Sequence, residues 1–315
     1  MRLGASLGIA ALLIVGMAGR ANAESCKDDQ PFDEATFKAR VAFLASKELD
    51  GRAPGTTGDA AARKMIVDRF TCLGLSPAFD TSYEQTFTAE KKTTANVVGY
   101  IAGTDKTVGT EIVLVTAHHD HLGDGHLGAN DNASGIVAML AVAQSIVQNE
   151  ATPKRTIVFA AFGAEETGMH GSYHYAAHAP EALPADRIVQ VVNLDMVGSH
   201  ASRGYVTAMG TFKGLAATRI LKKLLPSYPK LSVPMGGKAR GSDFEPFCKK
   251  GTPYVFFWTP DKRCYHAKCD TADKLDYKRM VDIARLATDL TNAMSDTEVD
   301  LAAAKATRGC FGNQR

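Results

Sequence analysis

Five side chains spread over the sequence have the types and the local settings of metal ligands. They are two histidines and three carboxylates: His118, Asp131, Glu166, Asp195 and His266. Two imidazoles and three carboxylates suffice for a pair of zinc ions if one carboxylate bridges them. A further acid, Glu165, directly precedes Glu166 and remains free to carry a proton. The set therefore predicts hydrolysis by a metal-activated water.

His118 directly follows an apolar run over 111–117 that is typical of a buried strand. Asp120 lies two residues further on, and side chains two apart in a strand share a face. We therefore expect the Asp120 carboxylate to hold the imidazole N–H of His118 and so to support catalysis. His119 would point the other way and have a structural role. Taken alone, a histidine at a strand end is most often a satisfied core or loop residue.

Asp131 lies between the turn Gly128-Ala129-Asn130 and a helix that is expected to begin near Ser134. A carboxylate at such a corner can present both oxygens outward and bridge two cations. The common alternative role of an aspartate at this position is a helix N-cap. Asn132 and Ser134 can take that role, which leaves Asp131 for metal.

Glu165 and Glu166 follow a second buried strand over 156–162. Adjacent side chains diverge, so that one can bind metal while the other faces the bound water. Like charges side by side raise one pKa unless cations lie nearby, and two dications would stabilise the pair. A water-facing glutamate can then take and return a proton. An acidic pair at the surface is the alternative, but the apolar strand indicates an interior site.

Asp195 ends the apolar run 191–195, and His266 lies in a loop after Trp258. A lone aspartate at a strand end is often a cap, so Asp195 is a candidate only together with the others. Asp270 is expected to support His266 from behind. The other histidines have no matching carboxylates and are interpreted as structural or exposed: His121, His126, His170, His174, His178 and His200.

Strand-like and helical segments alternate along the chain. The expected strands are 83–87, 95–101, 111–117, 156–162, 188–194, 205–207 and 254–258. The expected helices, after a helical segment over 33–75, are 134–148, 174–179, 211–225 and 274–293. Nearly continuous apolar strands are typical of a sheet covered by helices on both faces. The pattern predicts an α/β fold with a mostly parallel central sheet sandwiched by helices, and ligands gather at the carboxyl ends of such strands.

The first residues have the three-part pattern of a secretory signal peptide. Arg2 precedes an apolar run over 5–18, and Ala21-Asn22-Ala23 is a small-residue cleavage site. The alternative is an uncleaved anchor, but the run is short for a membrane span, which needs about 18 apolar residues. We expect residues 1–23 to be removed and residues 24–315 to form one catalytic domain, in the periplasm or outside the cell.

Charge and cysteines narrow the class of protein further. The net charge is +2, and the basic residues are scattered, which favours neither nucleic acid nor an anionic membrane. We expect a monomer. Six cysteines in an exported chain favour disulfides, although about 15 connectivities are open. The pairs that we expect are Cys264 with Cys269, Cys26 with Cys310, and Cys72 with Cys248.

Six motifs occur in the order in which a known family has them: AHHDH, GANDNASG, FGAEETG, NLDMVG, GSDFEPF and YHAKCDT. The chain resembles the dizinc aminopeptidases, which include secreted bacterial leucyl-type enzymes, with glutamate carboxypeptidase and glutaminyl cyclase as relatives. The resemblance implies a zinc-exopeptidase fold, phosphorylase/hydrolase-like, and removal of the first residue from peptides with a free N-terminus. It implies that His118 and Asp195 hold one zinc ion, and that His266 and Glu166 hold the other. Asp131 would bridge the two ions.

The resemblance also implies that Glu165 is first the general base and then the general acid, and that Asp131–Asn132 is a cis peptide. Two positions depart from the family pattern. Phe244 stands where many members have histidine, which would reshape the substrate pocket. The tyrosine that stabilises the oxyanion in some members has no clear match, and Arg240 or Tyr265 would take its place.

Other functions remain open at this stage. A glutaminyl cyclase-like acyltransferase would use a single zinc ion, and the zinc content per chain separates it from an aminopeptidase. A carboxypeptidase for acidic C-terminal residues would need a basic cluster, to which the sequence contributes Arg240 alone. A non-catalytic binding ectodomain tends to lose ligands or the general base, and this chain keeps all of them.

Overall fold

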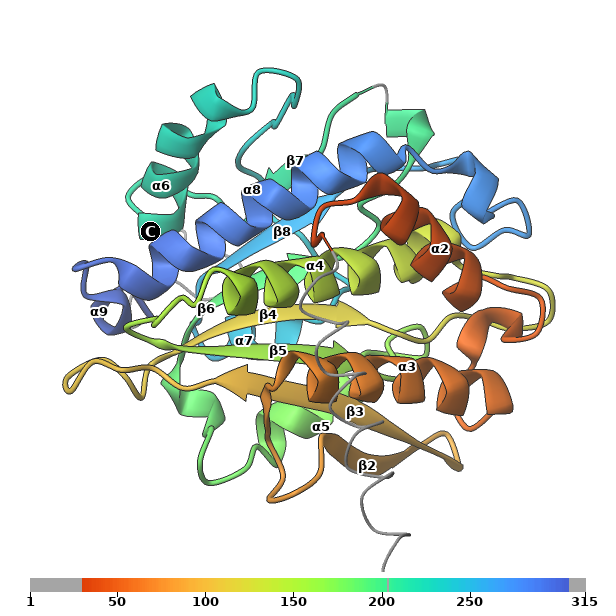
Figure 1. Ribbon diagram of the computed structural model, residues 1–315, viewed down its shortest axis with the longest axis horizontal. Coiled ribbons are helices and arrows are strands. Elements are labelled where there is room, and N and C mark those ends of the chain that lie inside the picture. The colour runs from red at the N-terminus through yellow and green to blue at the C-terminus, as the bar shows by residue number, and fades with distance from the viewer. Residues whose placement is uncertain (1–29, 203, 306–315) are drawn as a thin grey trace, which may run out of the picture.

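A mixed sheet of eight strands runs through the middle of the protein (Figure 1). The computed structural model describes residues 30–202 and 204–305. The strand order is β1-β3-β5-β4-β6-β8-β7, with β2 paired to β3. The strands are β1 (Ser76–Pro77), β2 (Glu84–Ala89), β3 (Lys92–Ile101), β4 (Ile112–His118), β5 (Thr156–Phe162), β6 (Ile188–Leu194), β7 (Thr207–Met209) and β8 (Tyr254–Trp258).

The central strands β5, β4, β6 and β8 are parallel, and the strands outside them are antiparallel. Every residue of β4, β5 and β6 is buried, as their apolar sequences require. β2 and β3 form an antiparallel hairpin because only Glu90 and Lys91, both with positive φ, connect them. The predicted α/β sandwich is confirmed, with parallel pairing confined to the centre of the sheet.

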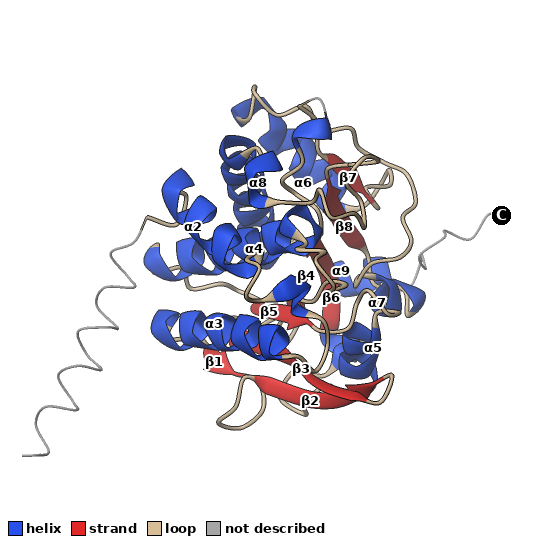
Figure 2. Ribbon diagram, turned by 90° about the vertical axis from the view of Figure 1, so that its right-hand side faces the viewer, coloured by secondary structure: helices blue, strands red, loops and turns tan. Residues whose placement is uncertain are grey.

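Helices cover both faces of the sheet (Figure 2). The helices are α2 (Glu34–Leu44), α3 (Thr57–Leu73), α4 (Ser134–Gln148), α5 (His170–Ala177), α6 (Ala216–Leu224), α7 (Glu245–Lys249), α8 (Tyr277–Asp296) and α9 (Leu301–Lys305). α5 and α7 lie on one face, and α2, α3, α4 and α8 lie on the other. α4 is buried from Ser134 to Ile146, which explains why its sequence is apolar almost all round.

Several segments match their predicted bounds residue for residue, namely α4, β5, β6 and β8. The predicted helix over 211–225 is wrong at its start, because Gly214 has a φ of 93° and α6 begins only at Ala216. α5 begins four residues earlier than expected, directly after Met169 with its φ of 57°. The short helices α7 and α9 span five residues each, too few to show a helical period in the sequence.

The predicted disulfide between Cys264 and Cys269 is confirmed. Cys72 and Cys248 are also disulfide-bonded, but α3 and α7, which carry them, lie on opposite sides of the sheet (Figure 2). The predicted bond between these two is therefore wrong. Cys26 and Cys310 lie outside the described residues, as does the expected signal peptide. None of the helices in the described part of the chain is both long and apolar enough to span a bilayer.

Candidate metal centre

The carboxyl ends of the central strands bring the five expected ligands together. His118 is the last residue of β4, and Asp195 directly follows β6. Glu166 lies in the loop after β5, Asp131 in the turn Ala129–Ala133 before α4, and His266 in the loop after β8. Separations of 2.9–3.4 Å between their side-chain atoms show that these residues form one cluster.

One group consists of His118, Asp131 and Asp195, whose possible ligand atoms lie within 4.8 Å of one another. His118 Nε2 is 3.3 Å from Asp131 Oδ1 and 3.4 Å from Asp195 Oδ1. Ligand atoms about 2 Å from a tetrahedral zinc ion lie about 3.3 Å apart. The spacing of this group therefore suits a single zinc ion.

A second group forms around His266. Its Nε2 lies 2.9 Å from Glu166 Oε2 and 3.4 Å from Asp131 Oδ2. Asp131 thus presents one oxygen to each histidine. Burial favours the neutral acid, yet hydrogen bonds from His118 and His266 lower the pKa of Asp131. The same contacts with Asp131 and Glu166 raise the pKa of His266 to about 10.

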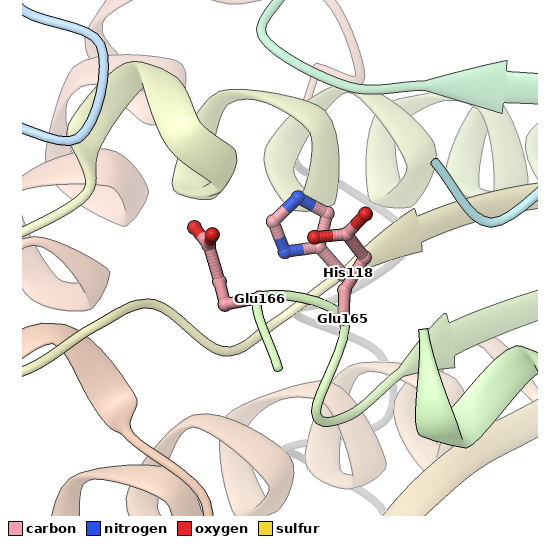
Figure 3. A group of neighbouring side chains, drawn as sticks. All are labelled: His118, Glu165 and Glu166. Carbon is pink, nitrogen blue, oxygen red and sulfur yellow. The ribbon is translucent and has the colours of Figure 1, made fainter. Parts of the chain in front are cut away.

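Glu165 lies beside the imidazole ring of His118, and Glu166 points to the other side of that ring (Figure 3). The two side chains therefore diverge, as their adjacency predicts. Burial raises the pKa of Glu165 well above its usual range, and nearby acids such as Asp243 act in the same direction. A carboxyl group whose pKa is raised in this way is suited to proton transfer.

Asp120 has a different contact from the one expected. His118 Nδ1 lies 3.2 Å from the backbone carbonyl oxygen of Asp120 and 3.8 Å from its carboxylate. The carboxylate instead accepts hydrogen bonds from the backbone N–H groups of Glu165, at 3.0 Å, and Glu166, at 3.3 Å. The strand ends at His118, so the two-residue alternation that would aim the carboxylate at His118 stops there. Asp120 therefore holds the loop that carries both glutamates.

Asp270 also differs from the expectation. Its carboxylate accepts hydrogen bonds from the backbone N–H groups of Asn130, at 2.8 Å, and Asp131, at 2.9 Å. It thus orients the chain at Asp131 rather than the ring of His266. The peptide between Asp131 and Asn132 is cis, as the resemblance implies.

His121 belongs to the cluster, although the sequence gives it no matching carboxylate. Its Nδ1 lies 2.5 Å from Glu166 Oε1, and it forms a possible metal-binding group with Asp131 and Glu166. Its Nε2 is buried without a partner among the described residues. The motif AHHDH could have indicated this role, because His121 is its third histidine.

Ser242 and Asp243 were also missed, although both lie in the motif GSDFEPF. The Ser242 hydroxyl donates to Asp195 Oδ2 at 2.7 Å and accepts from the side-chain amide of Asn193. Both carboxylate oxygens of Asp243 are buried without a partner in the described part of the chain. Burial raises the pKa of Asp243 to about 7, and the nearby His118 opposes this shift.

Arg52 supports the centre from the turn between α2 and α3, where it is fully buried. Its guanidinium donates to four backbone carbonyls, those of Leu44, His119, Leu127 and Gly128, at 2.5–2.9 Å. Three of these carbonyls belong to the loop that leads from β4 to Asp131. Burial lowers the pKa of Arg52 to about 10, and the neighbouring acids keep it from falling further. Arg52 therefore remains charged and ties the N-terminal helices to this loop.

A cavity of about 300 Å³ opens onto the cluster, and Asp131, Glu165, Asp195 and His266 form one side of it. Apolar side chains form another part of its wall: Met196, Met209, Phe256 and Trp258. Arg240 and Tyr265, the two candidates for oxyanion stabilisation, also line it. Phe244 does not: it is buried and stacks on Tyr254, with ring centroids 4.0 Å apart. Any effect of Phe244 on the pocket is therefore indirect, through Tyr254.

Comparison with known proteins agrees with the motifs. The model of peptidase family M28 matches residues 96–291. Leupeptin-inactivating enzyme 1 of Streptomyces exfoliatus is 26% identical over 258 residues, which are 76% of this chain and 56% of the relative. An aminopeptidase of Bacillus subtilis strain 168 is 31% identical over 208 residues, 62% of this chain and 44% of the relative. The chain thus spans about half the length of these curated relatives.

Solved structures share the fold. A zinc aminopeptidase from Bacillus subtilis superposes with a TM-score of 0.70 at 18% identity. The superposition covers 87% of this chain and 98% of that one. At this level of identity, the similarity establishes the same architecture.

Proposed function

Because the chain belongs to peptidase family M28, we propose that it is a zinc-dependent aminopeptidase that hydrolyses the first peptide bond of substrates with a free N-terminus. The observation that carries the proposal is the position of Asp131, which presents one oxygen to His118 and the other to His266. A carboxylate between two imidazoles in this way is suited to bridge two metal ions.

The proposal assigns the ligands of two zinc ions per chain. His118 and Asp195 would hold one ion, and His266 and Glu166 the other, with Asp131 between them. Contacts of 2.9–3.4 Å among these side chains support the assignment, because they are close to the separations expected of zinc ligands.

The chemistry divides between the metal and the chain. When bound, two zinc ions polarise the scissile carbonyl and lower the pKa of a water molecule toward neutrality. Glu165 accepts the proton of the attacking water and returns it to the departing amine. The acidic side chains around the centre attract the free α-amine of the substrate, which gives an exopeptidase.

Tyr265 is the better candidate for oxyanion stabilisation within this proposal. Its ring stacks on His266 at 3.8 Å between centroids, at the edge of the same cavity. Burial and the nearby acids, among them Asp131, raise the pKa of Tyr265 to about 12. The hydroxyl therefore keeps its proton at neutral pH and can donate it in a hydrogen bond to the substrate oxygen.

We also propose that the protein is exported and acts as a monomer. The leader pattern in residues 1–23 supports export. The disulfide between Cys264 and Cys269 supports it as well, since such bonds persist in oxidising compartments.

Metal removal tests the proposed function. Purified protein is expected to hydrolyse leucyl-p-nitroanilide, to lose this activity with a zinc chelator, and to regain it when zinc is added back. Elemental analysis of the active protein should give about two zinc ions per chain. An N-acetylated substrate serves as the control and should remain intact. Full activity with less than one zinc ion, or cyclisation of N-terminal glutamine with a single ion, would contradict the proposal.

His121→Ala is expected to weaken zinc binding at the Glu166 side of the centre by about 10- to 100-fold. The reason is that His121 contacts Glu166 Oε1 and so orients the other oxygen, which faces His266. Competition with a chromogenic chelator measures both zinc affinities. His126→Ala is the matched control, because His126 contacts the backbone of Gly123 and none of the expected ligands. Unchanged affinities in His121→Ala would show that Glu166 needs no such support.

A further inference from the structure

Two basic residues, Lys238 and Arg240, line the same cavity as Glu165 and the expected ligands. Both are exposed, and the reaction proposed above uses neither of them. We propose that this pair binds a carboxylate of the substrate, so that the enzyme favours short peptides whose C-terminal carboxylate lies close to the scissile bond. The inference rests on the proposed function and adds the substrate class.

The loop that carries the pair is held from inside the protein. Ala239, between the two basic residues, is buried, and its backbone N–H donates to the Tyr254 hydroxyl at 3.1 Å. Lys238 and Arg240 flank this anchored residue, and all three residues line the cavity.

The anchor of this loop depends on Phe244, the position that departs from the family pattern. Phe244 stacks on the ring of Tyr254, which in turn holds Ala239. At the far end of the loop, the backbone N–H of Gly241, at a φ of 72°, donates to Glu245 Oε2 at 3.3 Å. The basic pair thus lies on a segment that hydrogen bonds hold in place at Ala239 and at Gly241.

Charge favours an anionic ligand at this place. Lys238 forms no ion pair with any residue in the ranges 30–202 and 204–305. The Lys238 ammonium group can donate charge-assisted hydrogen bonds to a carboxylate, and Arg240, which lines the same cavity, adds a second positive charge beside it. A peptide that begins with lysine or arginine would meet repulsion from the same wall.

The size of the cavity limits where that carboxylate can be. A volume of about 300 Å³ is at the lower end for ligand sites, so only a few substrate groups fit within it. The apolar wall formed by Met196, Met209, Phe256 and Trp258 suits an apolar side chain. A carboxylate near Lys238 must then belong to a residue close to the scissile bond, either as the C-terminus of a short peptide or as an acidic side chain.

Matched substrates test this inference. Leucyl-alanine and leucyl-alaninamide differ only at the terminal carboxylate, and we expect kcat/KM to be about 10- to 100-fold higher for the free acid. In the double variant Lys238→Ala/Arg240→Ala, this ratio should fall toward 1. Lys222→Ala, an exposed lysine of α6 outside the cavity lining, is the control and should keep the wild-type ratio. A second pair, the α-amides of leucyl-glutamate and leucyl-glutamine, tests whether the basic residues also bind the carboxylate of an acidic side chain.

The outcomes separate the two proposals. A preference for glutamate over glutamine that disappears in the double variant would support carboxylate binding and identify the side chain as its source. Equal hydrolysis of acid and amide forms in both pairs by the wild type, or ratios that persist in the double variant, would overturn the carboxylate site and leave the aminopeptidase proposal intact. Failure to hydrolyse any of the four peptides would overturn both.

Discussion

Glu165→Gln is expected to lower kcat for peptide hydrolysis by about 10²- to 10⁴-fold while the protein keeps its zinc and its affinity for substrate. Glutamine has nearly the size and shape of glutamate, but its neutral amide cannot accept the proton of the attacking water. Glu165 lies beside the ring of His118, and Glu166 diverges from it toward His266. The proposal therefore assigns proton transfer to Glu165 and zinc binding to Glu166.

The measurement pairs steady-state kinetics with zinc analysis of the same samples. Glu181→Gln, at an exposed position away from the centre, is the matched control and should behave like the wild type. Activity within tenfold of the wild type would contradict the role of Glu165 in proton transfer. Loss of zinc from Glu165→Gln would instead make Glu165 a ligand, because its carboxylate lies within 4.8 Å of the possible ligand atoms of His118 and Glu166.

Arg52→Met is expected to lower the free energy of unfolding by at least about 4 kcal/mol, because an unpaired buried acceptor costs about 1–3 kcal/mol and four would lose their donor. The four are the backbone carbonyls described above. For a protein of this size, such a loss corresponds to a fall in Tm of roughly 10 °C. Calorimetry or urea unfolding of the zinc-free protein measures it without a contribution from metal.

Two further variants show whether the guanidinium itself is responsible. Arg52→Lys keeps the charge, but one ammonium group cannot reach all four carbonyls, so most of the loss should remain. Lys64→Met removes an exposed partner of Asp68 on α3 and should change Tm very little. A Tm of Arg52→Met within 2 °C of the wild type, a threshold of roughly 1 kcal/mol, would show that water replaces the guanidinium.

Much of the fold follows from patterns that involve neighbouring residues only. The strand Thr156–Phe162 and the helix Ser134–Gln148 have the expected bounds, because continuous burial leaves an unmistakable apolar run. The grouping of His118 with Asp195 follows in the same way, since parallel strands end at one edge of the sheet. The predicted start of a helix was wrong where a residue with positive φ interrupts the helical conformation, as Gly214 does before α6.

The contacts behind the expected ligands could not be predicted in this way. Asp120 and Asp270 bind backbone N–H groups, which every residue except proline possesses, so no residue type marks the partner. The same holds for Arg52, whose partners are all carbonyls. His121 and Asp243 lie in motifs, but their roles depend on side-chain directions that a sequence does not contain.

The position of Arg52 has a consequence for how the molecule is divided. The segment that matches the family, residues 96–291, contains every residue assigned to metal or to proton transfer. It begins after α2 and α3, so it leaves out the turn from which Arg52 donates hydrogen bonds to the loop before Asp131. The segment that holds the proposed ligands is thus shorter than the part of the chain that positions them. A fragment cut at the bounds of the family match would lose the hydrogen bonds of Arg52.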